Sequence, residues 1–96
     1  MQFTLKMTLE ARQAIDALAN TDRARYRKIL KTLGLMQTNM RHPGLHTHEY
    51  FALKGPNGEK VFEAYVENKT PAAYRVFWFY GPGQGEITII SVTSHA

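Results

Sequence analysis

Hydrophobic and polar residues alternate along this chain in distinct periods, and the clearest pattern lies near its end. Two apolar runs, 73–80 and 86–95, are rich in aromatic and β-branched side chains and flank five residues with three glycines and a proline. Such runs are typical of strands, and the residues between them favour a reversal. We therefore predict an antiparallel hairpin at the middle of a sheet.

Alternation within this hairpin predicts which side chains share a face. If Tyr80 and Glu86 flank the turn as a pair, Arg75 lies opposite Ser91. The face of Arg75 then also carries Ala73, Phe77, Phe79, Ile87, Ile89, Thr93 and His95. The other face, which suits helix packing, carries Tyr74, Val76, Trp78, Tyr80, Thr88, Ile90 and Val92. Arg75 and His95 are thus expected together on the face away from the helices, and a slip of one residue would separate them.

The first part of the chain predicts a strand followed by a helical hairpin. Residues 2–7 alternate in polarity, as a half-buried strand does. Thr8 can cap a helix that runs to about residue 19, and residues 20–22 supply a turn and a second cap. The helical spacing of apolar residues predicts two buried stripes, the first formed by Ala11, Ala14, Ile15 and Leu18 and the second by Tyr26, Ile29, Leu30, Leu33, Met36 and Met40.

A second hairpin follows the segment that ends the helices at Pro43 and Gly44. Strands over 50–54 and 60–67 flank residues 55–58, which read Gly-Pro-Asn-Gly and form a turn. Alternation gives the core Phe62, Ala64 and Val66, and places Val61, Glu63 and Tyr65 on the other face, where Glu63 and Tyr65 join Arg75. The predicted fold is α+β: an N-terminal strand, a helical hairpin, and a four-strand antiparallel meander sheet with helices on one face.

Length and composition narrow the class of protein. The 96 residues are 44% hydrophobic and 21% charged, which is ordinary globular composition and predicts one domain over 1–96. The chain has no cysteine, which excludes disulfides, thiolate nucleophiles and cysteine-based zinc sites. No signal peptide is visible, and no apolar run approaches the roughly 18 residues of a membrane span. We therefore expect a soluble, cytoplasmic protein that does not enter a membrane.

The charge favours a negatively charged partner. Lysine and arginine number 12 against 8 acidic residues, for a formal charge of +4. Such an excess favours nucleic acid or an acidic protein. Arg25 and other basic residues lie off the apolar stripe of the second helix, as either a solvated face or a phosphate-binding surface would require. A helix-turn-helix DNA reader is disfavoured, because that motif needs a third, supporting helix.

Three histidines, His42, His46 and His48, fall between the helices and the second hairpin. His46 and His48 point the same way if residues 45–53 are extended. No further histidine or carboxylate stands at a metal-binding helix spacing such as HExxH. We therefore predict no metal ligand and no cofactor, and interpret these histidines as polar loop residues or as RNA contacts.

The order of elements resembles that of the RelE/ParE toxin superfamily, the small basic toxins of bacterial toxin–antitoxin pairs. The resemblance covers essentially the whole chain. Tyr74-Arg75-Val76-Phe77-Trp78 is similar to the family's tyrosine–arginine–hydrophobic strand, and Thr93-Ser94-His95 is similar to the end of its closing strand. This sequence departs from the family in two respects. It lacks the paired lysines that some ribonuclease members carry on the third strand, and only Ala96 follows His95.

The resemblance implies a specific chemistry in the ribonuclease branch, which cleaves mRNA in the ribosomal A site without a metal. The 2′-hydroxyl attacks the adjacent phosphate, which requires a base, a cation and an acid. Arg75 matches the strand arginine and would hold the phosphate. His95 matches the C-terminal catalytic position and would be the general acid. The base would be Glu63, His46 or His48, which are chosen only from the direction in which their side chains are expected to point and not from a family motif. The RNA-binding residues are then Arg23, Arg27, Lys28, Lys31, Lys60 and Tyr65.

Two alternatives remain open within the same resemblance. A ParE-like toxin poisons DNA gyrase by protein contact, and a binding module with this fold needs no activity. In either toxin case we expect an acidic antitoxin as partner. The protein would then form a homodimer, or a heterotetramer with the antitoxin. Convergence of Arg75 and His95 on an open surface favours cleavage of mRNA on the ribosome, whereas burial of Arg75 away from His95 favours binding.

Overall fold

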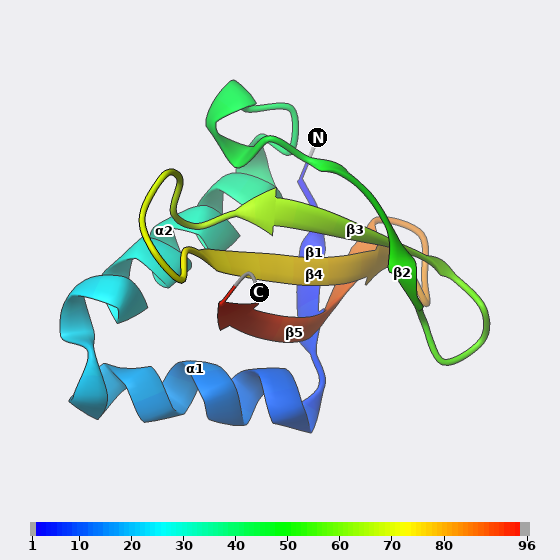
Figure 1. Cartoon of the computed structure of the whole chain (residues 1–96). Helices are drawn as coiled ribbons and strands as arrows, with labels where there is room; N and C mark the ends of the chain where they lie inside the picture. Colours follow the sequence, from blue (N-terminus) through cyan, green and yellow to red (C-terminus); the bar gives the residue numbers. More distant parts are fainter. Residues whose placement is uncertain (1, 95–96) are drawn as a thin grey trace.

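The computed structural model describes residues 2–94 and shows one mixed sheet with helices against one of its faces (Figure 1). This arrangement confirms the predicted α+β class. The elements are, in chain order, β1 (Thr4–Met7), α1 (Leu9–Thr21), α2 (Arg23–Thr38), the 3₁₀ helix η1 (Pro43–Leu45), β2 (His48–Lys54), β3 (Lys60–Tyr65), β4 (Tyr74–Tyr80) and β5 (Glu86–Ser94). No helix within 2–94 is long and apolar enough to span a membrane.

The sheet corrects one part of the predicted architecture. It has five strands in the order β1-β5-β4-β3-β2, and β1 pairs with β5 in parallel. A four-strand antiparallel sheet was therefore incomplete. The helices carry the chain from β1 to the opposite edge, where β2 begins, and the meander then returns strand by strand until β5 lies beside β1. Because β2 runs opposite to β1 and each of the three connections from β2 to β5 reverses the chain, β5 runs in the same direction as β1.

The helices begin where the sequence indicates. The Thr8 side chain accepts a hydrogen bond from the Ala11 N–H at 3.2 Å, and Asp22 Oδ1 accepts one from the Arg25 N–H at 3.2 Å. Each contact satisfies a backbone donor that the first turn of a helix leaves without an intrahelical partner. The second helix ends at Thr38, so Met40 lies beyond it.

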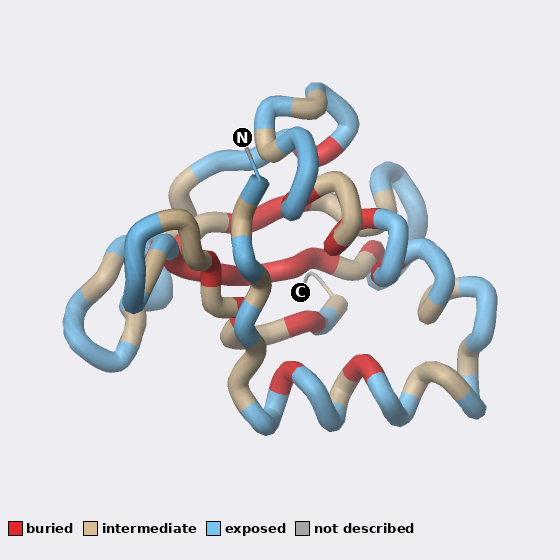
Figure 2. Tube along the Cα trace, turned by 180° about the vertical axis from the view of Figure 1, so that it is seen from behind, coloured by how far each residue is buried: buried red, intermediate tan, exposed pale blue. Residues whose placement is uncertain are grey.

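The core lies between the helices and the central strands. Figure 2 shows buried residues concentrated along the middle of the sheet and on the inner side of the helices. One predicted stripe residue is wrong: Leu30 is 45% exposed, and Thr32 is buried in α2 instead. Thr32 tolerates burial because its hydroxyl donates to the Lys28 carbonyl oxygen at 3.0 Å. The core cluster comprises Ala11, Ile15, Ile29, Leu33, Met36, Leu45, Ala64, Val76, Trp78, Ile87, Ile89 and Val92.

The register of the central hairpin differs from the prediction. Tyr80 pairs with Ile87 instead of Glu86. Glu86 is the first residue of β5, and its side chain accepts a hydrogen bond from the Gly83 N–H of the turn at 2.8 Å. A bulge then shifts the pairing once more between Phe77 and Trp78. Ile87 and Ile89 therefore face the helices, where we had placed Thr88 and Ile90. The two shifts add to two residues, so Arg75 pairs with Thr93 instead of Ser91 and keeps its predicted face.

The face opposite the helices is partly covered. Val61, Phe77 and Phe79 on this face have exposed fractions of 0%, 5% and 5%. The edge strand β2 curls in front of the sheet (Figure 1), and the Tyr50 ring packs edge-on against Phe77 with centroids 4.9 Å apart. A second, smaller apolar layer therefore supports the end of the sheet near Arg75.

Candidate functional site

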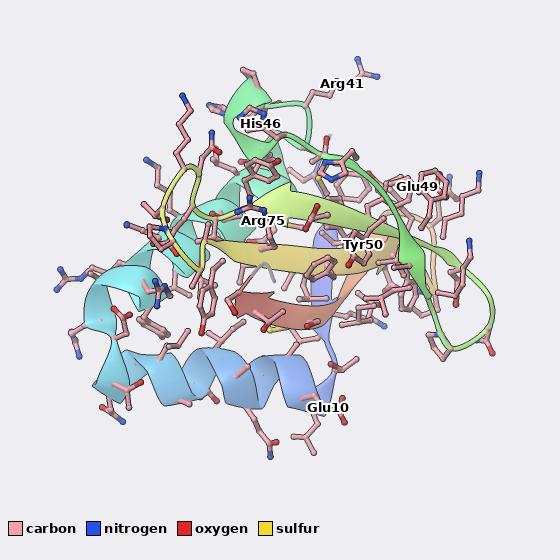
Figure 3. The ribbon with its side chains drawn as sticks, viewed as in Figure 1. Glu10, Arg41, His46, Glu49, Tyr50 and Arg75 are labelled. Atoms are coloured by element: carbon pink, nitrogen blue, oxygen red, sulfur yellow. The ribbon has the colours of Figure 1, made fainter. Side chains whose placement is uncertain are left out.

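Strand pairing gathers polar side chains on the face away from the helices. Tyr65 on β3 lies opposite Arg75 on β4, and His48 on β2 lies opposite Glu63 on β3. His46 joins them from the segment after η1, with its ring 4.8 Å from that of Tyr65. We call these five residues, His46, His48, Glu63, Tyr65 and Arg75, the open-face cluster. Figure 3 shows Arg75 on the sheet directly below His46.

His48 connects the cluster to solvent. Its Nε2 lies 2.6 Å from Glu63 Oε1, and its side chain is 46% exposed whereas that of Glu63 is 4% exposed. Its Nδ1 lies 2.7 Å from the carbonyl oxygen of His46. Both ring nitrogens thus lie within hydrogen-bond distance of oxygen atoms. His46 has a left-handed backbone, with φ of 50°, which turns the chain between η1 and β2.

Arg75 is held beneath the surface of the cluster. Its guanidinium carbon lies 3.7 Å from the centre of the Tyr65 ring, a cation–π contact. Nη1 donates to the carbonyl oxygens of Glu67 and Tyr74, and Nε lies 3.9 Å from Glu63 Oε2. The residue is 7% exposed. Arg75 therefore supplies positive charge close to the surface while much of its hydrogen-bonding capacity serves the protein itself.

Glu67 is a structural residue that the sequence did not single out. Its carboxylate accepts from Arg25 Nε at 3.0 Å, from Lys28 Nζ at 3.2 Å and from the Tyr74 N–H at 3.2 Å. Burial of the carboxylate raises its pKa, but these hydrogen bonds outweigh burial and leave the pKa of Glu67 below its ordinary value. A charged residue in a turn carries no signal that it will join two elements, so pattern alone could not identify it.

A groove of about 260 Å³ runs beside the cluster on the same face. It lies between the curled edge strand and the last residues of β5. Its lining is Tyr50, Ala52, Leu53, Phe77, Ser91, Thr93 and Ser94. The aromatic and hydroxyl side chains give this groove the mixed character of a surface that accepts a ribose or a base.

Comparison with known proteins identifies the fold. No family model and no curated protein sequence matches the chain. Among solved structures, the RelE chain of the archaeal RelE–RelB complex from Pyrococcus horikoshii superposes with a TM-score of 0.69 at 17% identity, over 98% of this chain and 96% of that one. A YoeB/ParE toxin from Agrobacterium tumefaciens gives 0.71 at 15%, over 98% and 100%. A YoeB–YefM complex from Staphylococcus aureus gives 0.68 at 12%, over the full length of both chains.

This chain has the RelE/YoeB/ParE toxin fold. The resemblance drawn from its order of elements is thereby confirmed at the level of the fold.

Within the RelE-like fold, most of the predicted catalytic residues come together. Glu63 lies beside Arg75, His48 contacts Glu63, and His46 packs against Tyr65, whose ring contacts Arg75. Arg75 is 7% exposed, so it does not present all of its guanidinium donors to the surface. His95 lies outside the described residues. Among residues 2–94, no group of three histidine, aspartate or glutamate side chains is positioned to hold a metal ion.

The predicted RNA-binding residues divide into two places in the RelE-like fold. Tyr65 lies in the cluster, and Lys28 and Lys31 are exposed on α2 nearby. Arg23 and Arg27 are exposed nearer the start of α2. Lys60 stands at the opposite end of β3 from Tyr65, where it pairs with Lys54, so the structure does not bring it to the cluster.

Proposed function

We propose that this protein is the toxin of a toxin–antitoxin pair and that it cleaves mRNA without a metal ion. The observation that carries the proposal is the contact of His48 with Glu63 beside Arg75, on the face that the helices leave uncovered. This places an exposed imidazole, a buried carboxylate and a guanidinium within one cluster. The RelE-like fold supports the toxin assignment, and the formal charge of +4 suits both a message and an acidic antitoxin.

The reaction requires two proton transfers. The 2′-oxygen of the ribose forms a bond to phosphorus and gives its proton to a base, while the bond from phosphorus to the 5′-oxygen breaks and that oxygen takes a proton from an acid. We assign the acid to His48: Nε2 stays on Glu63 Oε1, and the Nδ1–H turns from the His46 carbonyl oxygen, 2.7 Å away, to the 5′-oxygen and gives up its proton. The family resemblance implied His95 as the general acid; with His48 in that role, we propose that His95 instead accepts the proton from the 2′-hydroxyl.

Glu63 and Arg75 act from beneath the surface. Glu63 is a positioning residue that holds the His48 ring through Nε2. Arg75 places a positive charge under the phosphate, where surrounding apolar side chains reduce screening by water. His46 and Tyr65 hold these groups through ring contacts. Tyr65 also offers a ring edge on which RNA can pack.

Burial of Arg75 favours the second candidate function, a toxin that acts by binding another protein, as a ParE-like toxin binds gyrase. Its Nη1 is engaged by backbone carbonyls, as expected of an arginine that only supports the sheet. A RelE-fold module without activity would show the same contacts. One experiment separates these cases.

The test is controlled expression of the protein in bacteria, followed by mapping of message ends. We expect the unaltered protein to arrest growth and create new ends within messages. His48→Ala and Glu63→Gln should each reduce the yield of new ends by about 100-fold or more, the usual contribution of acid–base groups. Glu10→Gln, which removes an exposed carboxylate on α1 remote from the cluster (Figure 3), serves as the matched control.

Growth arrest with intact messages would overturn cleavage and support action through protein binding. Absence of arrest by the unaltered protein, when that protein is soluble and folded, would overturn the toxin assignment. Whether the protein cleaves messages or acts by binding, co-expression with an acidic protein encoded beside this chain should restore growth. Isolation of that pair as a heterotetramer would identify the antitoxin.

A further inference from the structure

A second groove, of about 390 Å³, lies between α2 and η1. Lys28 and Lys31 enter it from α2, and His42 and Gly44 enter it from η1. Tyr65 also lines it, and the same ring belongs to the open-face cluster. The remaining lining residues are Thr32, Leu35, Leu45 and Val66. The groove is thus a basic extension of the cluster toward the helices, and we call it the α2–η1 groove.

His42 is fixed in a defined orientation at the edge of this groove. Its Nδ1 accepts a hydrogen bond from the Gly44 N–H at 3.0 Å. In a ring whose Nδ1 is an acceptor, Nε2 carries the hydrogen and is available as a donor. A Cβ at position 44 would lie 3.0 Å from His42 Cε1 and 3.1 Å from Nδ1, so glycine at this position leaves room for the ring.

The two lysines of the groove differ in their ion pairs. Lys28 Nζ lies 3.2 Å from Glu67 Oε2, so its charge is partly offset. Lys31 has no carboxylate within ion-pair distance in the described part of the chain, and its side chain is exposed. The groove therefore offers at least one uncompensated positive charge and one oriented N–H donor, together with apolar walls.

We propose that the α2–η1 groove binds a phosphate of the RNA strand that flanks the bond cleaved at the open-face cluster. This inference rests on the proposed function, and the Tyr65 ring, which belongs to the cluster and lines the groove, joins the two sites. Lys31 contacts that phosphate, Nε2 of His42 donates to it, and the Tyr65 ring packs against the intervening nucleotide. The apolar walls suit a ribose or base better than the carboxylates of an acidic peptide, so RNA is the favoured occupant.

The test measures binding separately from cleavage. The probe is a fluorescent, mixed-sequence 2′-O-methyl RNA, which lacks the attacking hydroxyl. Lys31→Gln should weaken binding several-fold and reduce the dependence of log affinity on log salt by about 0.7, the value for one phosphate contact with a single strand. His42→Ala should weaken binding by about 2- to 10-fold at constant salt, as the loss of one hydrogen bond does.

Two further variants make the test specific. Arg12→Gln removes one positive charge from the exposed surface of α1 and should leave RNA affinity close to that of the unaltered protein. Gly44→Ala removes no charge but displaces the His42 ring, and should weaken binding as His42→Ala does. Thermal unfolding of each variant, followed by circular dichroism, verifies that the fold is retained.

The outcomes distinguish the groove from the cleavage proposal. Equal affinity of Lys31→Gln, His42→Ala and Arg12→Gln for the RNA would overturn the groove assignment even if the protein cleaves messages. Groove-dependent RNA binding by a protein that leaves messages intact would support the groove and overturn cleavage. If Lys31→Gln weakens binding of polyglutamate and leaves RNA affinity unchanged, the occupant is an acidic peptide and the assignment to RNA is wrong.

Discussion

At the scale of single residues, two acidic side chains, Glu63 and Glu67, have different roles. Glu63 holds the exposed ring of His48 on one side and approaches buried Arg75 on the other. Glu67 joins α2 to the segment before β4 through Arg25 and Lys28, and its hydrogen bond and charge raise the pKa of Arg25. These acidic residues are close in sequence, yet one supports the candidate site and the other supports the fold.

We expect the Glu67 contacts to make stability depend on pH. The folded-state pKa of Glu67 lies below its ordinary value of 4.5, so its contribution to the free energy of unfolding is present above that value and is lost as pH falls through the folded-state pKa. Glu67→Gln should reduce the free energy of unfolding at pH 7 by about 1.5–3 kcal/mol, the cost of hydrogen bonds to a charged group.

Urea unfolding of both proteins between pH 3 and 7 checks this expectation. The difference between them should shrink as the pH falls below 4.5. Glu10→Gln, exposed on α1, should show no such trend. A constant difference at all pH values would mean that the charge of Glu67 does not carry the effect.

A sulfur substitution can identify the residue that acts as the acid. A bridging 5′-sulfur at the mapped cleavage site leaves without a proton, so loss of the general acid should have little effect on that substrate. We expect His48→Ala to cleave the sulfur substrate at close to the unaltered rate and His95→Ala to remain slow. The rate of cleavage on ribosome-bound message is the measurement, and the reverse pattern would exchange the two roles.

At the level of elements, the sequence predicted those features that depend on residues a few positions apart. Thr8 and Asp22 cap their helices as predicted, because a cap needs only a side chain three residues from a backbone donor. The register of the central hairpin was predicted wrongly, because it depends on contacts between residues far apart in sequence. The Glu86 side chain accepts from the Gly83 N–H of the turn, and a bulge between Phe77 and Trp78 shifts the pairing of β4 with β5.

The cap at Asp22 is testable. Asp22→Ala removes the acceptor of the Arg25 N–H and the ion pair of the same carboxylate with Arg25 at 3.0 Å. We expect the free energy of unfolding to fall by about 1 kcal/mol, as for other helix caps. Asp22→Asn keeps the acceptor oxygen and should recover most of that loss. Chemical denaturation measures both, and equal losses would assign the effect to charge instead of capping.

At the scale of the whole molecule, the main apolar layer lies between the helices and the sheet. Trp78 is fully buried at 0% exposure, and Phe62 stacks on it with ring centroids 6.0 Å apart. A chain of this size buries a limited share of its surface. A single large cavity at Trp78 should therefore consume much of the stability that small domains possess, roughly 5–15 kcal/mol.

We expect Trp78→Ala to reduce the free energy of unfolding by about 3–5 kcal/mol through lost burial and the resulting cavity. Phe51→Ala is the matched control, because Phe51 is 75% exposed and its truncation should change stability by less than about 0.5 kcal/mol. Guanidinium unfolding followed by circular dichroism measures both. Similar losses at the two positions would show that the exposed side of β2 is covered by a partner in solution.

The sequence by itself determined the period of every main element, the caps, the apolar face of β3 and the position of Arg75 opposite the helices. Those features depend on neighbours one to four residues apart, which the chain specifies directly. Tertiary structure alone decided that β1 lies parallel to β5, that Arg75 is buried beneath Tyr65, and that Glu67 joins α2 to the sheet. Each of these depends on residues distant in sequence, whose approach is set by the packing of the whole core.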